Sequence, residues 1–173
     1  MSASNTLDRP LPILLDWLAR HGVEYEIHEH GPAFTARATA SAEGVDPRTF
    51  AKVVGVGTGD GRRILVVLDA TDHVDLFKAR GALGAEEVHL LTEPELTALA
   101  PDCEVGAIPA VGSLFGLRTF ADFAVRDDPD ISFNAGSHRF SARVERATWE
   151  RADGVVYADL ALESDTRPAW SRS

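Results

Sequence analysis

The sequence predicts an α+β domain built on a mixed, largely antiparallel sheet. Two β-branched runs, residues 50–57 and 62–69, flank Thr58-Gly59-Asp60-Gly61, a pattern typical of a β-hairpin. Helical and strand patterns do not alternate strictly along the chain, so a regular parallel βαβ arrangement is not expected. The 173 residues suit one domain with one core of ordinary size.

The chain before the hairpin contains two predicted helices and one strand. Apolar residues recur every three or four positions between Leu11 and Leu18, which predicts a helix over residues 10–21, ended by Gly22. Apolar and polar residues then alternate over residues 23–27, as in a strand. Thr35 is a suitable N-cap for a short helix that extends to residue 43.

After the hairpin the capping signals are clearer. Asp75 is expected to cap a helix that runs to residue 83 and is closed by Gly84. Thr92 and Glu95 form a capping box, which predicts a helix to about residue 100. A strand over residues 87–91 is expected between these two helices.

The last third of the chain begins with a loop rich in Gly and Pro and continues mostly as strands. In order, we expect a loop at 101–116, strands at 118–123, 130–134 and 138–145, a short helix at 148–152 and a strand at 155–162. Residues 1–163 are thus expected to form a single domain, and residues 164–173 a disordered tail.

Composition limits the function classes. No apolar run approaches the roughly 20 residues that span a bilayer, and the N-terminus lacks the features of a signal peptide. A single cysteine, Cys103, excludes an internal disulfide and a cysteine-rich zinc site. The net charge of −10 argues against general nucleic-acid binding, although not against a local grip on one end of an RNA. We therefore expect a cytoplasmic protein that binds neither DNA nor membranes.

Lys52 is the first candidate functional residue. Lysine is rare in this chain, where Lys52 and Lys78 are the only two, and Lys52 lies inside an apolar strand pattern. Such a lysine either extends its ammonium group to water or points into a pocket where it meets an anion or a developing oxyanion.

Two glycine-containing segments are further candidates. Residues 106–109, Gly106-Ala107-Ile108-Pro109, could present backbone N–H groups to a carbonyl or phosphate, or could be an ordinary surface loop. Residues 131–138 end in Asn134-Ala135-Gly136-Ser137-His138, which brings polar side chains, open backbone and an imidazole to one bend. The simpler interpretation of this second segment is a hairpin turn.

Other polar groups carry weaker signals. His28 and His30 lack a third ligand at a telling spacing, so no metal site is expected. The acidic cluster at residues 122–130 is interpreted as a solvated strand end. Three arginines form the best local basic patch, with an ordinary solvent-facing ladder as the alternative: Arg139, Arg143 and Arg146.

Five motifs in order resemble the YbaK/EbsC family of aminoacyl-tRNA deacylases, which are related to the editing domain of bacterial prolyl-tRNA synthetases. The motifs cover roughly residues 28–151 and lie at residues 28–35, 50–56, 73–76 with 83–84, 103–109 and 131–138. The resemblance implies a compact fold with a central sheet or partial barrel and helices packed outside.

The resemblance also implies roles for the candidate residues. Lys52 falls on the family's essential lysine, Gly106 and Pro109 on its first loop, and Gly136 and His138 on its second. We expect Lys52 to anchor the adenosine or phosphate end and to stabilise local charge. Backbone N–H groups of Gly106 and Gly136 are then expected to polarise the carbonyl, and His138 to bond substrate or water or to act as a general base, unless a ribose hydroxyl assists the water.

The remaining loop residues complete the expected substrate-binding set. Short or apolar groups should wall the pocket, beside the polar Asn134 and Ser137, and they are Ala107, Ile108, Pro109 and Ala135. Such a wall suits a small aminoacyl group. Ala110 stands where the family often has a second proline, which bears on which amino acid is accepted.

The implied function is a free-standing deacylase that hydrolyses the ester of mischarged tRNA without a metal or other cofactor. The expected substrate is tRNA(Pro) carrying a small amino acid such as alanine, bound by its acceptor end, with prolyl-tRNA synthetase as a possible partner. Two alternatives remain at this point: a non-catalytic module that binds tRNA or a synthetase, and an unrelated small-ester hydrolase.

Overall fold

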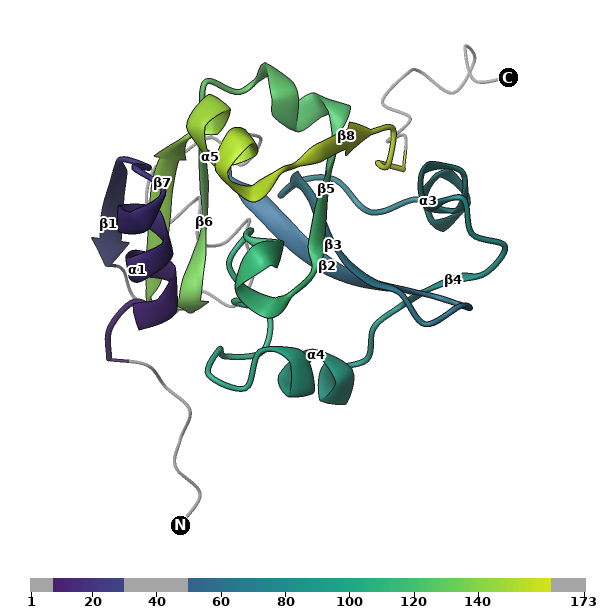
Figure 1. Ribbon diagram of the computed structural model, residues 1–173, viewed down its shortest axis with the longest axis horizontal. Coiled ribbons are helices and arrows are strands. Elements are labelled where there is room, and N and C mark those ends of the chain that lie inside the picture. The colour runs from purple at the N-terminus through teal and green to yellow at the C-terminus, as the bar shows by residue number, and fades with distance from the viewer. Residues whose placement is uncertain (1–7, 30–49, 163–173) are drawn as a thin grey trace.

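The computed structural model describes residues 8–29 and 50–162 (Figure 1). The helix expected at residues 35–43 and the tail expected from residue 164 lie outside these ranges.

The strands of the described residues form two sheets that do not close into a barrel (Figure 1). The three-stranded antiparallel sheet has the order β1-β7-β6, with bounds Tyr25–Glu29, Phe140–Glu145 and Asp130–Ser137. The five-stranded sheet has the order β4-β2-β3-β5-β8, with bounds Val88–Leu90, Ala51–Thr58, Arg63–Asp69, Arg118–Asp122 and Val156–Ala158. Only β3–β5 and β5–β8 pair in parallel. The expected α+β class and mixed, largely antiparallel pairing are confirmed.

The two faces of the five-stranded sheet pack against different clusters. Leu65 and Val67 of β3 point into the main core, which lies between the sheets and includes residues of α1 (Pro12–Arg20). Ile64, Val66 and Leu68 point to the other face, where α3 (Leu76–Leu83) packs. Because both faces of β3 are covered, its sequence is a continuous apolar run without alternation.

One backbone contact joins the two sheets. Phe50, just before β2, forms an isolated parallel bridge with Ser132 of β6. Phe50 is fully buried, and its carbonyl also accepts a hydrogen bond from Ala70 N at 2.8 Å. The start of β2 is therefore fixed against both β6 and the turn that follows β3.

The predicted helix caps are present. Asp75 accepts hydrogen bonds from Phe77 N and Lys78 N, and Gly84 ends α3 in the left-handed conformation. Thr92 and Glu95 make both bonds of the capping box at the start of α4 (Glu93–Leu99). These local signals depend on neighbours in sequence, which is why they were visible without the fold.

The structure differs from the sequence prediction in several segments. The strand expected at residues 155–162 is only Val156–Ala158, and the helix expected at 148–152 spans Arg146–Asp153. β6 continues to Ser137 through an irregularity between Asn134 and Ser137, so the bend expected at residues 134–136 is a bulge and the turn comes after it. The strand expected at residues 118–123 stops at Asp122, whose side chain caps a 3₁₀ helix, Phe123–Asp127, by accepting from Ala124 N.

No helix in the described ranges is long and apolar enough to cross a membrane.

A single buried indole supports the loop before the first 3₁₀ helix, Gly112–Phe115. Trp149 on α5 (Arg146–Asp153) is fully buried and donates from Nε1 to Ala110 O at 2.7 Å. Trp149→Phe should therefore lower the free energy of unfolding by about 1–3 kcal/mol, because the variant leaves a buried carbonyl without its donor. Urea unfolding of both proteins measures this loss, and an unchanged midpoint would contradict it.

Candidate functional site

Lys52 lies at the start of β2, and the turn that follows β3 binds its side chain. It pairs with Leu68, so its side chain lies on the sheet face opposite the main core. The half-buried ammonium group donates to the backbone carbonyl of Asp72. Burial lowers the pKa of Lys52, and the charge of Asp72 partly opposes this shift. The carbonyl of Asp72 thus orients the ammonium group of Lys52, which is partly removed from water.

A group of carboxylates lies behind this lysine. Burial raises the pKa of Asp69 to about 8, with further contributions from the nearby charges of Asp128 and Asp72 and a hydrogen bond with Asp128. Asp122 is buried and accepts from Leu160 N and Ala161 N at 2.8 and 2.9 Å. The acidic cluster is therefore only in part the solvated strand end that its sequence indicated: Asp127 is exposed, but Asp122 serves as a backbone acceptor and Asp128 contacts Asp69.

Asn134 follows the junction of the two sheets on β6, as Lys52 follows it on β2. The parallel bridge between Phe50 and Ser132 places Lys52 and Asn134, each two residues further on, on the same side. Phe133 and Ala135 belong to the main core, so Asn134 points to the opposite face. Its side chain is 6% exposed, and its Oδ1 has no hydrogen-bond partner in the described part of the chain. A buried amide of this kind is suited to a ligand.

The two glycine loops are bound to each other through their backbones. Gly136 N donates to Ala107 O, and Glu104 N donates to Gly136 O, both at 2.9 Å. Gly136 has a φ of +87°, and a Cβ there would lie 2.8 Å from the Cβ of Leu11. Because the N–H of Gly136 already bonds Ala107, its expected role as a donor to the substrate carbonyl is wrong for this arrangement. Gly136 instead joins its own loop to the loop at residues 104–109 through two backbone hydrogen bonds.

Gly106 differs from Gly136 in its surroundings. It is exposed, has a φ of +80°, and makes no backbone hydrogen bond through its N–H to the described residues. A left-handed φ favours glycine, and because glycine has no side chain, the backbone N–H of this residue stays accessible. Gly106 remains the loop's candidate donor.

His138 joins the same cluster. Its ring is 5% exposed and packs near Gly106, where an added Cβ would lie 3.4 Å from Cε1. Nε2 lies 2.6 Å from Val105 O, and the backbone N donates to Glu104 Oε2 at 3.3 Å. Since a carbonyl only accepts, Nε2 must carry the proton of that bond. In this geometry His138 positions the first loop, and Nε2 is not the general base that the sequence suggested.

The remaining loop residues are buried behind the site. Ala107 and Ala135 are fully buried, and Ile108 and Ala135 belong to the main core. Pro109 O accepts from Val111 N at 2.8 Å, and Ser137 Oγ accepts from Arg139 N at 3.1 Å. The side chains of Ala107, Ile108 and Ala135 therefore pack beneath the loop backbones on the core side and do not line a solvent-accessible pocket wall.

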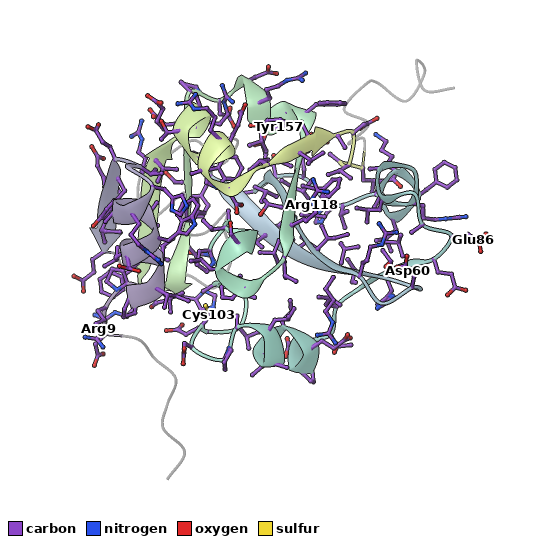
Figure 2. All side chains as sticks on the ribbon, in the orientation of Figure 1. Arg9, Asp60, Glu86, Cys103, Arg118 and Tyr157 are labelled. Carbon is purple, nitrogen blue, oxygen red and sulfur yellow. The ribbon has the colours of Figure 1, made fainter. Side chains whose placement is uncertain are left out.

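Several weaker candidates do not join the site. Each arginine of the expected basic patch is ion-paired: Arg139 with Glu29, Arg143 with Asp130 and Arg146 with Glu150. Cys103 is buried, which raises its thiol pKa to about 12 (Figure 2). His28 lies near Glu26, and His30 lies outside the described residues. Within the described ranges no three His, Cys, Asp or Glu side chains are grouped to hold a metal ion.

Comparison with known families decides the relationship. The aminoacyl-tRNA editing domain family matches residues 30–152. This chain belongs to that family. The matched range contains Lys52 and both glycine loops, as the YbaK-like resemblance of the motifs implied.

Solved structures show the same fold. The candidate trans-editing enzyme for prolyl tRNA synthetase has 21% identity and a TM-score of 0.77, with 91% of this chain and 100% of that chain covered. The hypothetical protein APE2540 has 18% identity and a TM-score of 0.79, with 86% and 99% covered. A scaffold protein from computational epitope grafting has 23% identity and a TM-score of 0.74, with 87% and 95% covered. No curated protein matches the chain.

The Asp69 carboxyl predicts a pH dependence of stability. Its pKa in the folded protein is raised from 3.8 to about 8, so the folded state binds this proton more tightly than the unfolded chain does. The resulting stabilisation is present at low pH and is lost as the pH rises to about 8. Asp69→Asn keeps a neutral group, so the wild type should lose stability relative to this variant between about pH 4 and pH 8.

Urea unfolding of both proteins across this pH range checks the prediction. Asp127→Asn, which alters an exposed carboxylate at the end of the 3₁₀ helix Phe123–Asp127, is the control and should follow the wild type. Parallel curves for the wild type and Asp69→Asn would show that Asp69 does not retain its proton.

Proposed function

We propose that this protein is a trans-editing aminoacyl-tRNA deacylase that hydrolyses the ester of mischarged tRNA in the cytoplasm. The observation that carries the proposal is the bridge between Phe50 and Ser132, from which Lys52 and Asn134 follow on one side of two adjoining strands, with Asn134 Oδ1 lacking a hydrogen-bond partner among the described residues. The favoured substrate is tRNA(Pro) carrying a small amino acid, alanine first. Similarity to the candidate trans-editing enzyme supports prolyl-tRNA synthetase as the associated enzyme.

The reaction needs little covalent chemistry from the protein. Water adds to the ester carbonyl, the carbonyl oxygen becomes an oxyanion, and the ribose oxygen leaves with a proton. A positioned donor to the oxyanion contributes roughly 10²–10³ in rate. Lys52 is the proposed charge-stabilising group, because its ammonium is oriented by Asp72 and partly removed from water. The N–H of Gly106 is the proposed second donor.

Asn134 is proposed to bind the adenine of the terminal adenosine. A primary amide has a donor and an acceptor side by side, and asparagine pairs with the N6 and N7 atoms of adenine in this way. The buried amide of Asn134 has an unused acceptor, so this base would satisfy it. Lys52, which follows the bridge between the sheets on β2, would then lie near the ribose and ester.

Selection by size is proposed to come from the loop at residues 106–109. Gly136 and His138 clasp this loop, and the buried Ile108 and Ala135 support it. A rigid loop excludes bulky side chains by steric clash, whereas a single methylene is discriminated by only about 1–3 kcal/mol. Serine, cysteine and threonine esters should thus be hydrolysed more slowly than alanine esters, and aromatic esters not at all.

Lys52→Met should abolish deacylation of alanyl-tRNA(Pro), because methionine keeps the side-chain length and removes the ammonium group. A loss of at least 10²-fold in kcat/KM is expected. The assay compares alanyl-, seryl-, cysteinyl-, threonyl-, prolyl- and phenylalanyl-tRNA, in the presence of chelator.

Lys78→Met is the matched control, because it removes the only other lysine of the chain. Lys78 lies on α3 and forms an ion pair with Asp159. It should keep full activity. Normal turnover by Lys52→Met would refute the assignment, and activity on simple esters but on no tRNA would favour a small-ester hydrolase. Tight tRNA binding without turnover by the wild type would indicate a non-catalytic module.

Asn134→Leu should raise KM for alanyl-tRNA about tenfold or more, since one good amide–adenine pair is worth about 1–3 kcal/mol. With tRNA ending in 7-deazaadenosine, which lacks N7, the wild type should lose part of its affinity and the variant should lose no more. Equal losses for both proteins would show that Asn134 does not bind this edge of adenine.

A further inference from the structure

The acidic protein needs a local surface that accepts phosphates, and the arginines favoured from the sequence do not supply it. Arg139, Arg143 and Arg146 are neutralised by carboxylates within hydrogen-bonding or ion-pair distance. A different group of arginines lies where β3 and β5 of the five-stranded sheet begin, around a groove of about 630 Å³. We call it the arginine groove, and its rim is Arg62, Arg63 and Arg118.

The rim arginines are exposed above an apolar floor that includes Leu99, Leu117 and Phe120. Arg118 stands on β5 with its guanidinium 5.7 Å from the ring centre of Phe120, and Figure 2 labels it there. Stacking on a ring orients a guanidinium while its N–H donors stay open for a phosphate. Neither Arg118 nor Arg63 has an ion-pair partner in the described part of the chain.

The carboxylates near the groove are few and already engaged. Asp60 bonds Arg62, whose Nη1 also donates to Leu83 O at 2.9 Å, so Arg62 is fixed at the rim. On α4, the Glu95 carboxylate accepts hydrogen bonds from Thr92 in the capping box, and its charge interacts with that of Arg63 without an ion pair between them. In a protein of net charge −10, the groove therefore presents two arginines, Arg63 and Arg118, that have no ion-pair partner among the described residues.

Part of the groove lies on the same sheet face as Lys52, whereas Arg63, one residue before Ile64 at the start of β3, points toward the other face. Ile64 and Phe120 line both the groove and the cluster on the Lys52 face, and Lys52 pairs with Leu68 of the same cluster. Arg63 precedes Leu68 by five residues on β3, which at about 3.3 Å per residue separates the groove from Lys52 by roughly 16 Å. Spanning this distance takes a strand longer than the three nucleotides of a CCA end.

We propose that the arginine groove binds the phosphate backbone of the tRNA at a point several nucleotides from the terminal adenosine. The inference rests on the proposed function for the identity of the RNA. The guanidinium groups of Arg63 and Arg118 contact phosphate oxygens, and the apolar floor accepts the ribose edge between them. The ester at Lys52 and the backbone in the groove are then two contacts of one substrate.

The test uses the full chain with Arg63→Ala, Arg118→Ala and the double variant. Arg151→Ala is the matched control, because it removes an exposed arginine on α5 that also has no ion-pair partner among the described residues. Binding of uncharged tRNA is measured over a range of salt concentrations. Deacylation is measured on alanyl-tRNA and on an alanyl ester of a CCA trinucleotide, which is too short to reach the groove.

Each groove variant should weaken tRNA binding and lower the slope of log affinity against log salt by about one. The double variant should lose about two units of slope, and the trinucleotide ester should be hydrolysed at the wild-type rate by every variant. Because binding is measured on uncharged tRNA, failure of the wild type to deacylate any tRNA would refute only the proposed function.

Three results would overturn the inference. One is an equal weakening by Arg151→Ala, which would mean a general charge effect. Another is a matching loss on the trinucleotide ester, which would mean that the groove acts through the fold. The third is stoichiometric binding of free AMP that the double variant abolishes while tRNA affinity stays unchanged, since the groove would then serve a mononucleotide.

Discussion

The contact between Phe50 and Ser132 is the constraint on which the site depends. Among the described residues this bridge is the backbone pairing of a residue next to β2 with β6, and it sets the level of β2 against β6. Since side chains alternate along a strand, this one pairing determines that Lys52 and Asn134 face the same side. The turn after β3 then fixes the ammonium group, because Ala70 bonds Phe50 and Asp72 accepts from Lys52.

The two glycine loops depend on a second set of backbone contacts. Gly136 is enclosed by Leu11 from α1 and by Ala107 from the first loop, so the N-terminal helix supports the site from the core side. The structure separates positions that define loop geometry, such as Gly136 and His138, from those that can face a substrate, such as Lys52 and Gly106. All four carry similar weight in the sequence motifs.

Much of the fold was predictable because its signals are local. The caps at Asp75 and at Thr92 with Glu95, and the hairpin at residues 58–61, use neighbours within a few positions. Long-range effects were not predictable. The bulge in β6 arises where Gly136 bonds the 106–109 loop, and Asp122 became a buried acceptor because residues 160 and 161 return to it. The ion pair of Arg139 with Glu29 likewise joins residues far apart in sequence, and that of Arg143 with Asp130 joins the neighbouring strands β7 and β6.

The same limit applies to the site. Lysine rarity and the motifs identified Lys52, but nothing near Asn134 in sequence indicates that its Oδ1 has no hydrogen-bond partner in the described part of the chain. The arginine groove was equally hidden, because Arg62 and Arg63 are separated from Arg118 by more than 50 residues. Parallel pairing of β3 with β5 brings them together by placing Ile64 opposite Arg118.

The lengths of the outer strands have a consequence for behaviour at high concentration. The five-stranded sheet ends in β4 and β8, each of only three residues, and few unpaired backbone groups are exposed along such short edges. Of the edge strands in the three-stranded sheet, β1 carries charged Glu26 and Glu29, and β6 is buried along nearly its whole length. Short or charged edges give an incoming strand of another molecule little to pair with. The domain is therefore built to resist edge-to-edge aggregation, so crowding by its own copies should not drive it into fibrillar sheets.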